Sequence, residues 1–131
     1  MLARDVAAGI DVRVWDVHTR APTELNRRLL RNEMLDAMVG LRGAETLPLI
    51  AAGDYNATIW HQELRELLDT GLTDAAEHVG KGLATTWKGA PILETPIDHV
   101  LVSDEVTVLD VHVGEGRGSD HRPVIADLAV G

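Results

Sequence analysis

The stretch Leu47-Pro48-Leu49-Ile50-Ala51-Ala52-Gly53-Asp54-Tyr55-Asn56 decides the fold, because an apolar run leads directly into polar residues. Residues 47–52 are too few for a typical helix and are apolar on both faces, which is typical of a strand buried inside a sheet. Asp54 and Asn56 then stand where this strand ends. Strand ends commonly carry the functional groups of α/β proteins, so the stretch predicts both a sheet and a site at its edge.

Helices are predicted on both sides of this strand in the sequence. Upstream, leucine and methionine recur at steps of three and four residues over 25–40, and Thr23 is the expected N-cap. Downstream, Thr58 is the expected N-cap of a second helix over 59–70, and a short helical turn is expected over 73–77. Three arginines of the first helix are interpreted as a solvated face: Arg27, Arg28 and Arg31.

Four further segments are predicted to be strands: 10–18, 97–103, 106–113 and 124–130. The segment 78–95 is rich in glycine and threonine and is expected to form a loop. Strands separated by helices, followed by strands joined by short turns, indicate an α/β protein with a mixed sheet and helices on one face. Several strands are apolar on both faces, so the other face is expected to need a partner from outside the chain.

The composition limits the possible functions. Of the 131 residues, 45% are hydrophobic, which is sufficient for one domain with a packed core. The net charge of −9 argues against a basic groove for many phosphates, so a phosphate-bearing substrate would need a metal ion or a few arginines. The lack of cysteine excludes disulfides, thiol nucleophiles and zinc–thiolate sites. No apolar run reaches the roughly 20 residues that span a bilayer.

Polar side chains gather where the predicted strands begin or end. They are His18, Asp54, Asn56, Asp98, Asp120 and His121. A carboxylate inside an apolar run, such as Asp98, needs a partner, and the imidazole of His121 is the obvious candidate. Asp54 and Asn56 offer oxygen ligands that suit Mg²⁺ or orient phosphate oxygens. Each residue also has a structural explanation, since Asp and Asn form turns and strand-end caps, and a histidine such as His18 can be a polar group at a sheet edge.

Three segments resemble motifs of the endonuclease/exonuclease/phosphatase family. The segments Gly53-Asp54-Tyr55-Asn56-Ala57-Thr58, Ile97-Asp98-His99-Val100-Leu101 and Gly118-Ser119-Asp120-His121-Arg122-Pro123-Val124 look like its GDxN, IDH and SDHRPV motifs. Val17-His18-Thr19-Arg20-Ala21-Pro22 is similar to the family's central strand end that bears a histidine. The resemblance implies the C-terminal half of a DNase I-like four-layer α/β sandwich over residues 11–131. Residues 1–10 are then a poorly patterned extension.

The resemblance also implies a role for each site residue in metal-dependent hydrolysis of a phosphate ester or anhydride. His121 would act as general base or acid, Asp98 would orient its imidazole, and Asp54 would position or activate the attacking water. Asn56 and His18 would hydrogen-bond phosphate oxygens. Asp120 would reach the divalent ion, Mg²⁺ or Mn²⁺.

Two other histidines lie near these motifs. His61 follows on the second predicted helix and would either line the pocket or be solvated. His99 neighbours Asp98 but is expected to point to the opposite side of its strand, so it is not expected in the site.

One departure from the family pattern is large. Members of the family have two similar sheet-bearing halves, and the N-terminal half carries the glutamate that binds the metal. Nothing before residue 11 can supply that half, so the chain is expected to be the C-terminal half of a longer protein, called the parent protein below, and to be inactive alone.

The finer resemblance is to bacterial members found behind transmembrane helices. It rests on Asn56-Ala57-Thr58, His61, the segment 71–75 and Thr86-Trp87. That group includes phosphohydrolases thought to act on polyprenyl pyrophosphate outside the membrane. The implied substrate is therefore a phosphorylated small molecule or lipid, and a membrane-anchored parent protein is one option for a localisation that the sequence leaves open.

Two other functions remain open. A metal-dependent nuclease would use the same residues, although the acidic charge and the few aromatic residues favour nucleic acid less. A non-catalytic half-domain would instead pair through its open sheet face, either with the missing N-terminal half or with a second copy of the chain as a homodimer.

Overall fold

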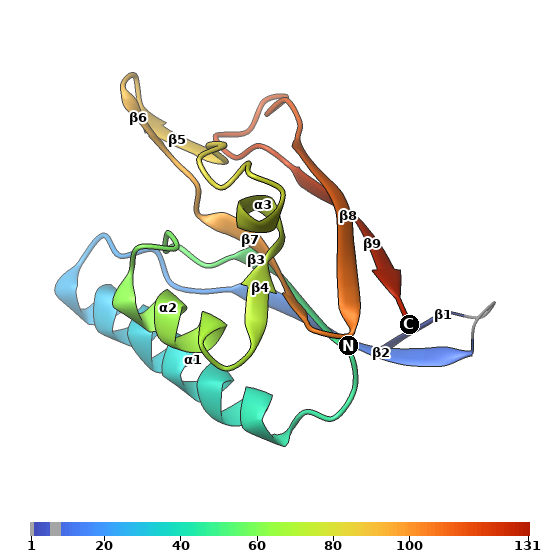
Figure 1. Cartoon of the computed structure of the whole chain (residues 1–131). Helices are drawn as coiled ribbons and strands as arrows, with labels where there is room; N and C mark the ends of the chain where they lie inside the picture. Colours follow the sequence, from blue (N-terminus) through green and yellow to red (C-terminus); the bar gives the residue numbers. More distant parts are fainter. Residues whose placement is uncertain (1, 6–8) are drawn as a thin grey trace.

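The computed structural model describes residues 2–5 and 9–131, in which helices separate the strands from β2 to β5 and the last five strands follow one another (Figure 1). The strands are β1 (Leu2–Asp5), β2 (Ile10–His18), β3 (Leu49–Asp54), β4 (Leu72–Asp74), β5 (Trp87–Ala90), β6 (Leu93–Thr95), β7 (Asp98–Ser103), β8 (Val106–Val113) and β9 (Val124–Val130). The helices are α1 (Leu25–Ala44), α2 (Gln62–Leu68) and α3 (Ala75–His78). The predicted α/β class is confirmed.

The central sheet has five strands in the order β1-β2-β3-β7-β4. β2 and β3 are parallel, and α1 is the crossover that a parallel pair requires. The pairs β1 with β2, β3 with β7, and β7 with β4 are antiparallel. The sheet is therefore mixed, as the sequence predicts.

The helices α1 and α2 pack against one face of this sheet (Figure 1). Their apolar cluster consists of Val17, Leu35, Leu49, Ala51, Tyr55, Ala57, Ile59, Leu64, Leu67, Leu68, Leu72 and Leu101. The hydroxyl of the fully buried Tyr55 donates to the Ala51 carbonyl at 3.1 Å, so its one polar side-chain atom is satisfied. Along β2, Trp15 and Val17 contact this cluster while Asp16 between them is exposed, as the two-residue period of a strand requires.

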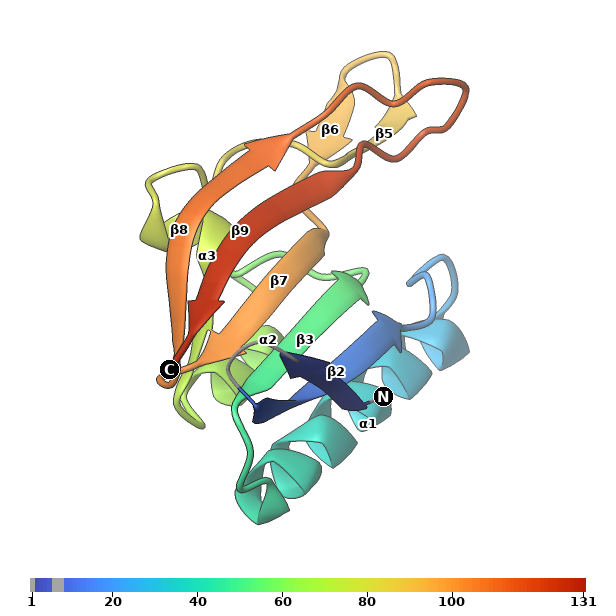
Figure 2. The same cartoon turned by 90° about the vertical axis from the view of Figure 1, so that its right-hand side faces the viewer.

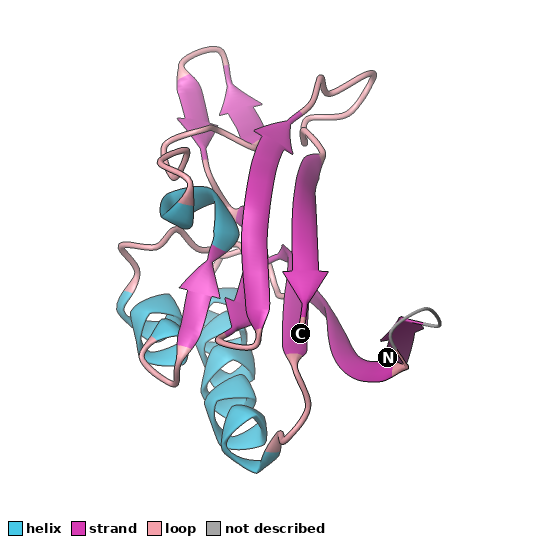
Figure 3. Cartoon of the chain, turned by 45° about the vertical axis from the view of Figure 1, so that its right-hand side comes forward, coloured by secondary structure: helices cyan, strands magenta, loops and turns pink. Residues whose placement is uncertain are grey.

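The opposite face is covered beside β7 by the β8–β9 hairpin and by α3 (Figure 2; the hairpin ends at the C-terminus marked in Figure 3). A second apolar cluster joins these elements: Ala75, Val100, Val102, Val106 and Val111. The expectation that nothing in the chain covers this face is therefore wrong beside β7, because the hairpin folds back over it. Beside β2 the face is more open, with Asp16 exposed and Val14 half-buried.

The helices α1 and α2 begin and end at other residues than the sequence predicts. α1 continues through Gly40, and its N-cap residue is Glu24 instead of Thr23. α2 begins after His61, whose ring accepts a hydrogen bond from the Thr58 amide at 2.9 Å and turns the chain before the helix starts. Among the helices of the described ranges, none has the length and apolarity needed to cross a membrane.

Three strands lie where the sequence pattern predicts no regular structure. The segment 78–95 contains the β5–β6 hairpin, which forms a sheet of its own away from the central one (Figure 1). Residues 1–10 include β1, which pairs with β2 and therefore extends the central sheet. Strands of three or four residues are too short to produce a readable alternation of polar and apolar residues.

Candidate active site

Three strand termini meet at one edge of the central sheet. β2 ends at His18, β3 ends at Asp54, and β7 begins at Asp98. In the register of the sheet His18 pairs with Asp54, and Asp54 pairs with Asp98, so the three residues stand in a row across neighbouring strands. Regular strand pairing alone is sufficient to bring these predicted site residues together.

Gly53 permits the close packing of β2 and β3 just before this row. Its φ of 146° lies in a region that residues with a side chain rarely adopt. A Cβ atom at this position would stand 1.9 Å from the carbonyl oxygen of Val17. Glycine is therefore required here. The close packing that it permits sets the position of the next residue, Asp54, relative to β2.

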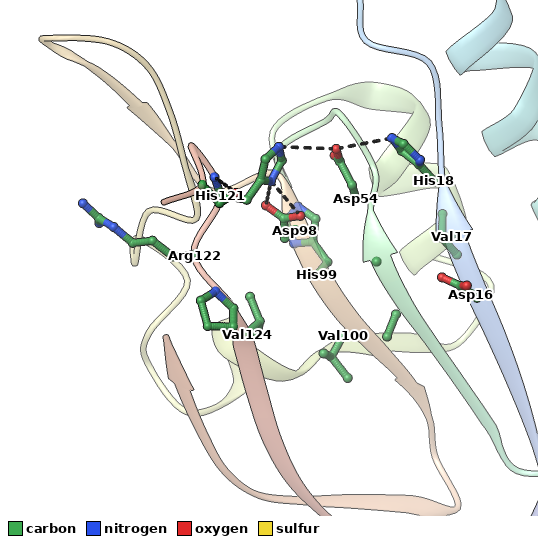
Figure 4. A pocket seen from close by; sticks show the side chains of 14 residues that line it. Asp16, Val17, His18, Asp54, Asp98, His99, Val100, His121, Arg122 and Val124 are labelled. Atoms are coloured by element: carbon green, nitrogen blue, oxygen red, sulfur yellow. Dashed lines mark hydrogen bonds and ion pairs between the residues drawn. The ribbon is translucent and has the colours of Figure 1, made fainter. Parts of the chain in front are cut away.

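His121 completes the row (Figure 4). Its Nδ1 lies 2.9 Å from Oδ2 of Asp98, and its Nε2 lies 3.8 Å from Oδ2 of Asp54. The same Asp54 oxygen is 3.9 Å from Nε2 of His18. The His18 side chain is 81% exposed, whereas those of Asp54 and Asp98 are each 18% exposed. The structure thus brings together four of the predicted site residues, with the imidazole of His121 between two half-buried carboxylates.

The loop that carries His121 is held by β5. His121 forms an isolated bridge with Trp87, and the amide of Arg122 donates to the Thr86 carbonyl at 2.6 Å. The hydroxyl of Thr86, which is buried, accepts hydrogen bonds from the amides of Ile97 and Asp98, each at 3.0 Å. Thr86 therefore connects the loop of the histidine to the first residue of β7, which carries its carboxylate partner.

Asn56 stands beside this row in a constrained conformation. Its φ is 46°, in the left-handed region, and its amide donates to Oδ1 of Asp54 at 2.8 Å. Its side-chain Nδ2 donates to the Thr19 carbonyl at 3.1 Å, which fixes the orientation of the amide group. The second hydrogen of Nδ2 can donate to a ligand oxygen.

The electrostatics of the row shift two pKa values. Burial raises the pKa of Asp54, the Asn56 amide lowers it, and the nearby charge of Asp98 raises it. For His121, burial opposes protonation, but the hydrogen bond to Asp98 and the charges of Asp98, Asp54 and Asp120 raise its pKa above the ordinary value. The charged form of the imidazole is therefore favoured relative to that of a solvated histidine, and the Asp54 carboxylate is a stronger base than a solvated one.

One group of the described residues has the spacing to hold a metal ion. Ligand atoms of Asp54, Asp98 and His121 all lie within 4.8 Å of one another. Asp120, the predicted metal residue, lies outside that group: its carboxylate accepts a hydrogen bond from the indole of Trp87 at 3.0 Å. Asp54 and Asp120 line the same cavity, and carboxylate oxygens are the donors that a hard cation such as Mg²⁺ prefers.

Two cavities flank the row. One, of about 760 Å³, lies on the face covered by the β8–β9 hairpin and reaches Asp16, Ala52, Val100 and Val124 (Figure 4). The other, of about 600 Å³, is lined by Ala21, Pro22, Thr23, Arg31, Asn56, Thr58, His61, Trp87, Thr95, Ile97 and Asp120. His18, Asp54 and His121 line both, and no glutamate is among the described residues that line either cavity.

Two polar residues near the site are buried: one, Arg31, was not identified from the sequence, and the other, His99, points away from the row as predicted. Arg31, predicted to be solvated, is only 3% exposed, and its Nη1 donates to the Asn56 carbonyl at 3.0 Å. His99 points away from the row: its Nδ1 lies 2.6 Å from Asp74 Oδ2, and its Nε2 lies 2.8 Å from the Ala57 carbonyl. Helical periodicity places Arg31 close to the buried stripe of α1 through Leu35, four residues later, and that spacing is the signal that could have identified it.

The sequence matches a family model described as Endonuclease/Exonuclease/phosphatase family over residues 2–121. No match is found among curated proteins. Among solved structures, the chain is similar to an endonuclease/exonuclease/phosphatase from Beutenbergia cavernae, with 22% identity and a TM-score of 0.79 over 99% of this chain and 38% of that one.

Two further similar structures have more specific descriptions. A mannosyl-6-phosphatase from Bacteroides thetaiotaomicron is 21% identical, with a TM-score of 0.63 over 96% of this chain and 54% of that one. TDP2 from D. rerio, in complex with a single-stranded DNA product, is 19% identical, with a TM-score of 0.76 over 94% of this chain and 58% of that one. At such identities the likeness shows the DNase I-like fold, and the chain spans between 38% and 58% of the length of these three proteins.

Proposed function

Because this chain belongs to the endonuclease/exonuclease/phosphatase family, we propose that it carries the proton-transfer groups of a divalent-metal-dependent phosphohydrolase. The observation that carries the proposal is the position of His121, 2.9 Å from Asp98 and 3.8 Å from Asp54. An imidazole between two carboxylates at a cavity is a common arrangement for proton transfer near neutral pH.

Each residue of the row has a distinct task in this mechanism. Asp54, whose pKa is raised by burial, accepts a proton from the attacking water. Asp98 holds Nδ1–H of His121, so that Nε2–H donates to a phosphate oxygen as negative charge develops. Asn56 and His18 donate further hydrogen bonds to phosphate oxygens. A Mg²⁺ or Mn²⁺ ion, when bound, would neutralise negative charge on the phosphate, and Asp120 together with Asp54 would contribute oxygen ligands to it.

We further propose that turnover needs a glutamate from outside these 131 residues. The support is that no glutamate is among the described residues lining the two cavities, and that the chain spans little more than half of its structural relatives at most. On this proposal the purified chain releases phosphate no faster than buffer. Robust Mg²⁺-dependent release by the chain alone would contradict it.

The test of the phosphohydrolase is phosphate release by the parent protein with and without Mg²⁺. His121→Asn should lower kcat about 10²- to 10⁴-fold, which is the usual contribution of a general acid or base. His112→Asn is the matched control, because His112 is exposed on β8. Activity of His121→Asn within a few fold of the control would refute the assigned role of His121.

A polyprenyl pyrophosphate is the substrate that the finer resemblance suggests, and a nucleic acid is the alternative. The alternative is supported by the likeness to a TDP2 structure that contains a single-stranded DNA product. The net charge of −9 speaks against it. Phosphate release from polyprenyl pyrophosphate, compared with nicking of plasmid DNA by the same preparation, separates the two.

A third proposal is that the chain pairs through its sheet face, either with the N-terminal half of the parent protein or with a second copy. The more open part of this face beside β2, where Asp16 is exposed and Val14 half-buried, supports it. Light scattering of the purified chain tests the homodimer, and a monomeric mass at high concentration would contradict it.

A further inference from the structure

A buried cation lies next to the catalytic row. Arg31 of α1 is 3% exposed, and it lines the 600 Å³ cavity together with Asp54, Asn56 and His121. Arginine is rarely buried unless its charge has a partner, so the surroundings of this side chain need explanation.

The hydrogen bonds of Arg31 go to neutral acceptors. Nη1 donates to the carbonyl oxygen of Asn56 at 3.0 Å, while Nε and Nη2 donate to Oδ1 of Asn32 at 3.0 and 2.8 Å. A guanidinium has five N–H groups, so these three bonds leave two of them unused. Within the described ranges, no carboxylate forms an ion pair with Arg31.

The negative charge that compensates Arg31 does not contact it directly. Asn32 donates to Oε1 of Glu63, so the carboxylate of Glu63 reaches Arg31 only through an amide. Burial lowers the pKa of Arg31, and the charge of Glu63 offsets part of that effect. A charge with partial compensation in a buried position is costly for folding, which is typical of a group kept for binding.

The same cavity contains a second donor. Nδ1 of His61 accepts the hydrogen bond of the Thr58 amide at 2.9 Å, so the neutral ring carries its hydrogen on Nε2. Pro22, Trp87 and Ile97 supply apolar walls. The carboxylates that line the cavity, Asp54 and Asp120, belong to the catalytic row and its loop, so the remaining polar lining is neutral or cationic.

We propose that Arg31 forms a second anion subsite, which binds the phosphate group of the substrate that water does not attack. The substrate class is then a diphosphate, such as a phosphoanhydride, in preference to a simple phosphate monoester. This inference rests on the proposed phosphohydrolase function and specifies its substrate. The two unused N–H groups of Arg31 and Nε2–H of His61 are the donors, and a guanidinium is well suited to phosphate oxygens.

The subsite has a chemical role when the anhydride breaks. The water oxygen bonds to the attacked phosphorus, the bond from that phosphorus to the bridging oxygen breaks, and its electron pair stays on the bridging oxygen. The proton of the water passes to Asp54. The departing phosphate therefore gains negative charge, which Arg31 stabilises.

Ligand binding to the purified chain tests the subsite without requiring turnover. The probes are inorganic phosphate and methylenediphosphonate, titrated calorimetrically at one fixed free Mg²⁺ concentration. Arg31→Gln removes the charge but keeps a donor for the Asn56 carbonyl, Arg31→Lys keeps the charge, and Arg28→Gln removes an exposed arginine of the same helix. Circular dichroism and urea unfolding establish that each variant is folded.

The wild-type chain and Arg28→Gln should bind methylenediphosphonate at least about tenfold more tightly than phosphate, which corresponds to 1.4 kcal/mol. Arg31→Gln should lose this preference while its phosphate affinity stays within about twofold, and Arg31→Lys should retain part of it. A preference that survives in Arg31→Gln would overturn the subsite. Equal losses for both ligands would also overturn it, because Arg31 would then act only by holding Asn56.

The outcome also separates this inference from the proposed function. A wild-type chain that binds phosphate without preferring the diphosphonate refutes the subsite and leaves the phosphohydrolase standing. A wild-type chain that binds neither ligand also refutes the subsite, and the phosphohydrolase is then decided by phosphate release from the parent protein.

Discussion

His121 and Asp98 meet at 2.9 Å although they lie 23 residues apart in the sequence. The histidine comes from the loop before β9, and the aspartate is the first residue of β7. Their contact places a hydrogen on Nδ1 and leaves Nε2 facing Asp54 at 3.8 Å. One imidazole therefore links two carboxylates that strand pairing alone sets side by side.

Asp98→Asn should lower the pKa of His121. Burial opposes protonation of this ring, and the hydrogen bond and charge of Asp98 are the largest of the effects that raise the pKa. Asp120→Asn should lower it less, because the charge of Asp120 is the smallest contribution of those identified. NMR titration of the imidazole signals in the purified chain measures both changes, with the exposed Asp127→Asn as control.

The same shift has a consequence for stability. Because the pKa of His121 is raised in the folded chain, the pair with Asp98 stabilises fully below the ordinary histidine value of about 6.5. That contribution is lost as the pH rises through the raised pKa. Urea unfolding should therefore show a smaller difference between wild type and Asp98→Asn at pH 9 than at pH 6, and a difference independent of pH would contradict the assignment.

Asn56→Gly and Asn56→Ala should distinguish the effect of the backbone conformation of residue 56 from the effect of its side-chain amide. The φ of 46° costs a residue with a side chain about 1 to 2 kcal/mol, and glycine adopts it readily. Asn56→Ala should therefore be about 1 kcal/mol less stable to urea than Asn56→Gly. In the parent protein both should lose phosphate release, because both lack the amide, and near-normal activity of Asn56→Gly would refute the role of that group.

The buried pair of His99 and Asp74 should be important for stability. Both nitrogens of His99 have buried partners, Nδ1 the Asp74 carboxyl group at 2.6 Å and Nε2 the Ala57 carbonyl at 2.8 Å. His99→Ala leaves the carboxylate of Asp74, 2% exposed, without this partner and should lower the free energy of unfolding by about 3 to 5 kcal/mol. Urea denaturation measures it, and the exposed Asp69→Asn should change it by less than about 0.5 kcal/mol.

Gly53→Ala should be strongly destabilising, because its Cβ would stand 1.9 Å from a backbone oxygen of β2. We expect a loss of about 3 kcal/mol or more in the free energy of unfolding. Gly43→Ala in the last turn of α1 is the control: nothing lies within 4 Å of its Cβ position, and alanine favours the helix by up to about 1 kcal/mol. Equal stability of the two variants would show that β2 and β3 can move apart at this point.

Three members of the row, His18, Asp54 and Asp98, could be predicted because each stands at the end of a readable strand. Asp54 follows an apolar run, and Asp98 interrupts another, so local pattern identified both. For Arg31 the four-residue spacing to Leu35 indicates a position near the buried stripe of α1, but its hydrogen bond to the Asn56 carbonyl is a long-range contact that no local pattern contains. The pairing of His99 with Asp74 likewise depends on the distance between two strands, which no local pattern contains.

The β8–β9 hairpin shows the same limit at the level of the fold. Its strands were predicted, but their return over β7 was not, because alternation within a strand does not tell which sheet its apolar side contacts. The strands of the β5–β6 hairpin are too short to show an alternation of polar and apolar residues, so the hairpin could not be predicted, although it holds the loop of His121.

The two sides of the site rest on different apolar clusters. Asp54 continues a strand packed by α1 and α2, whereas His121 is carried by the hairpin of the second cluster. A local opening of that hairpin would remove the imidazole while the helices and their amides stay protected from hydrogen exchange. Hydrogen exchange of the β8–β9 amides, compared with that of the α1 and α2 amides, measures whether this opening costs less free energy than unfolding of the whole chain.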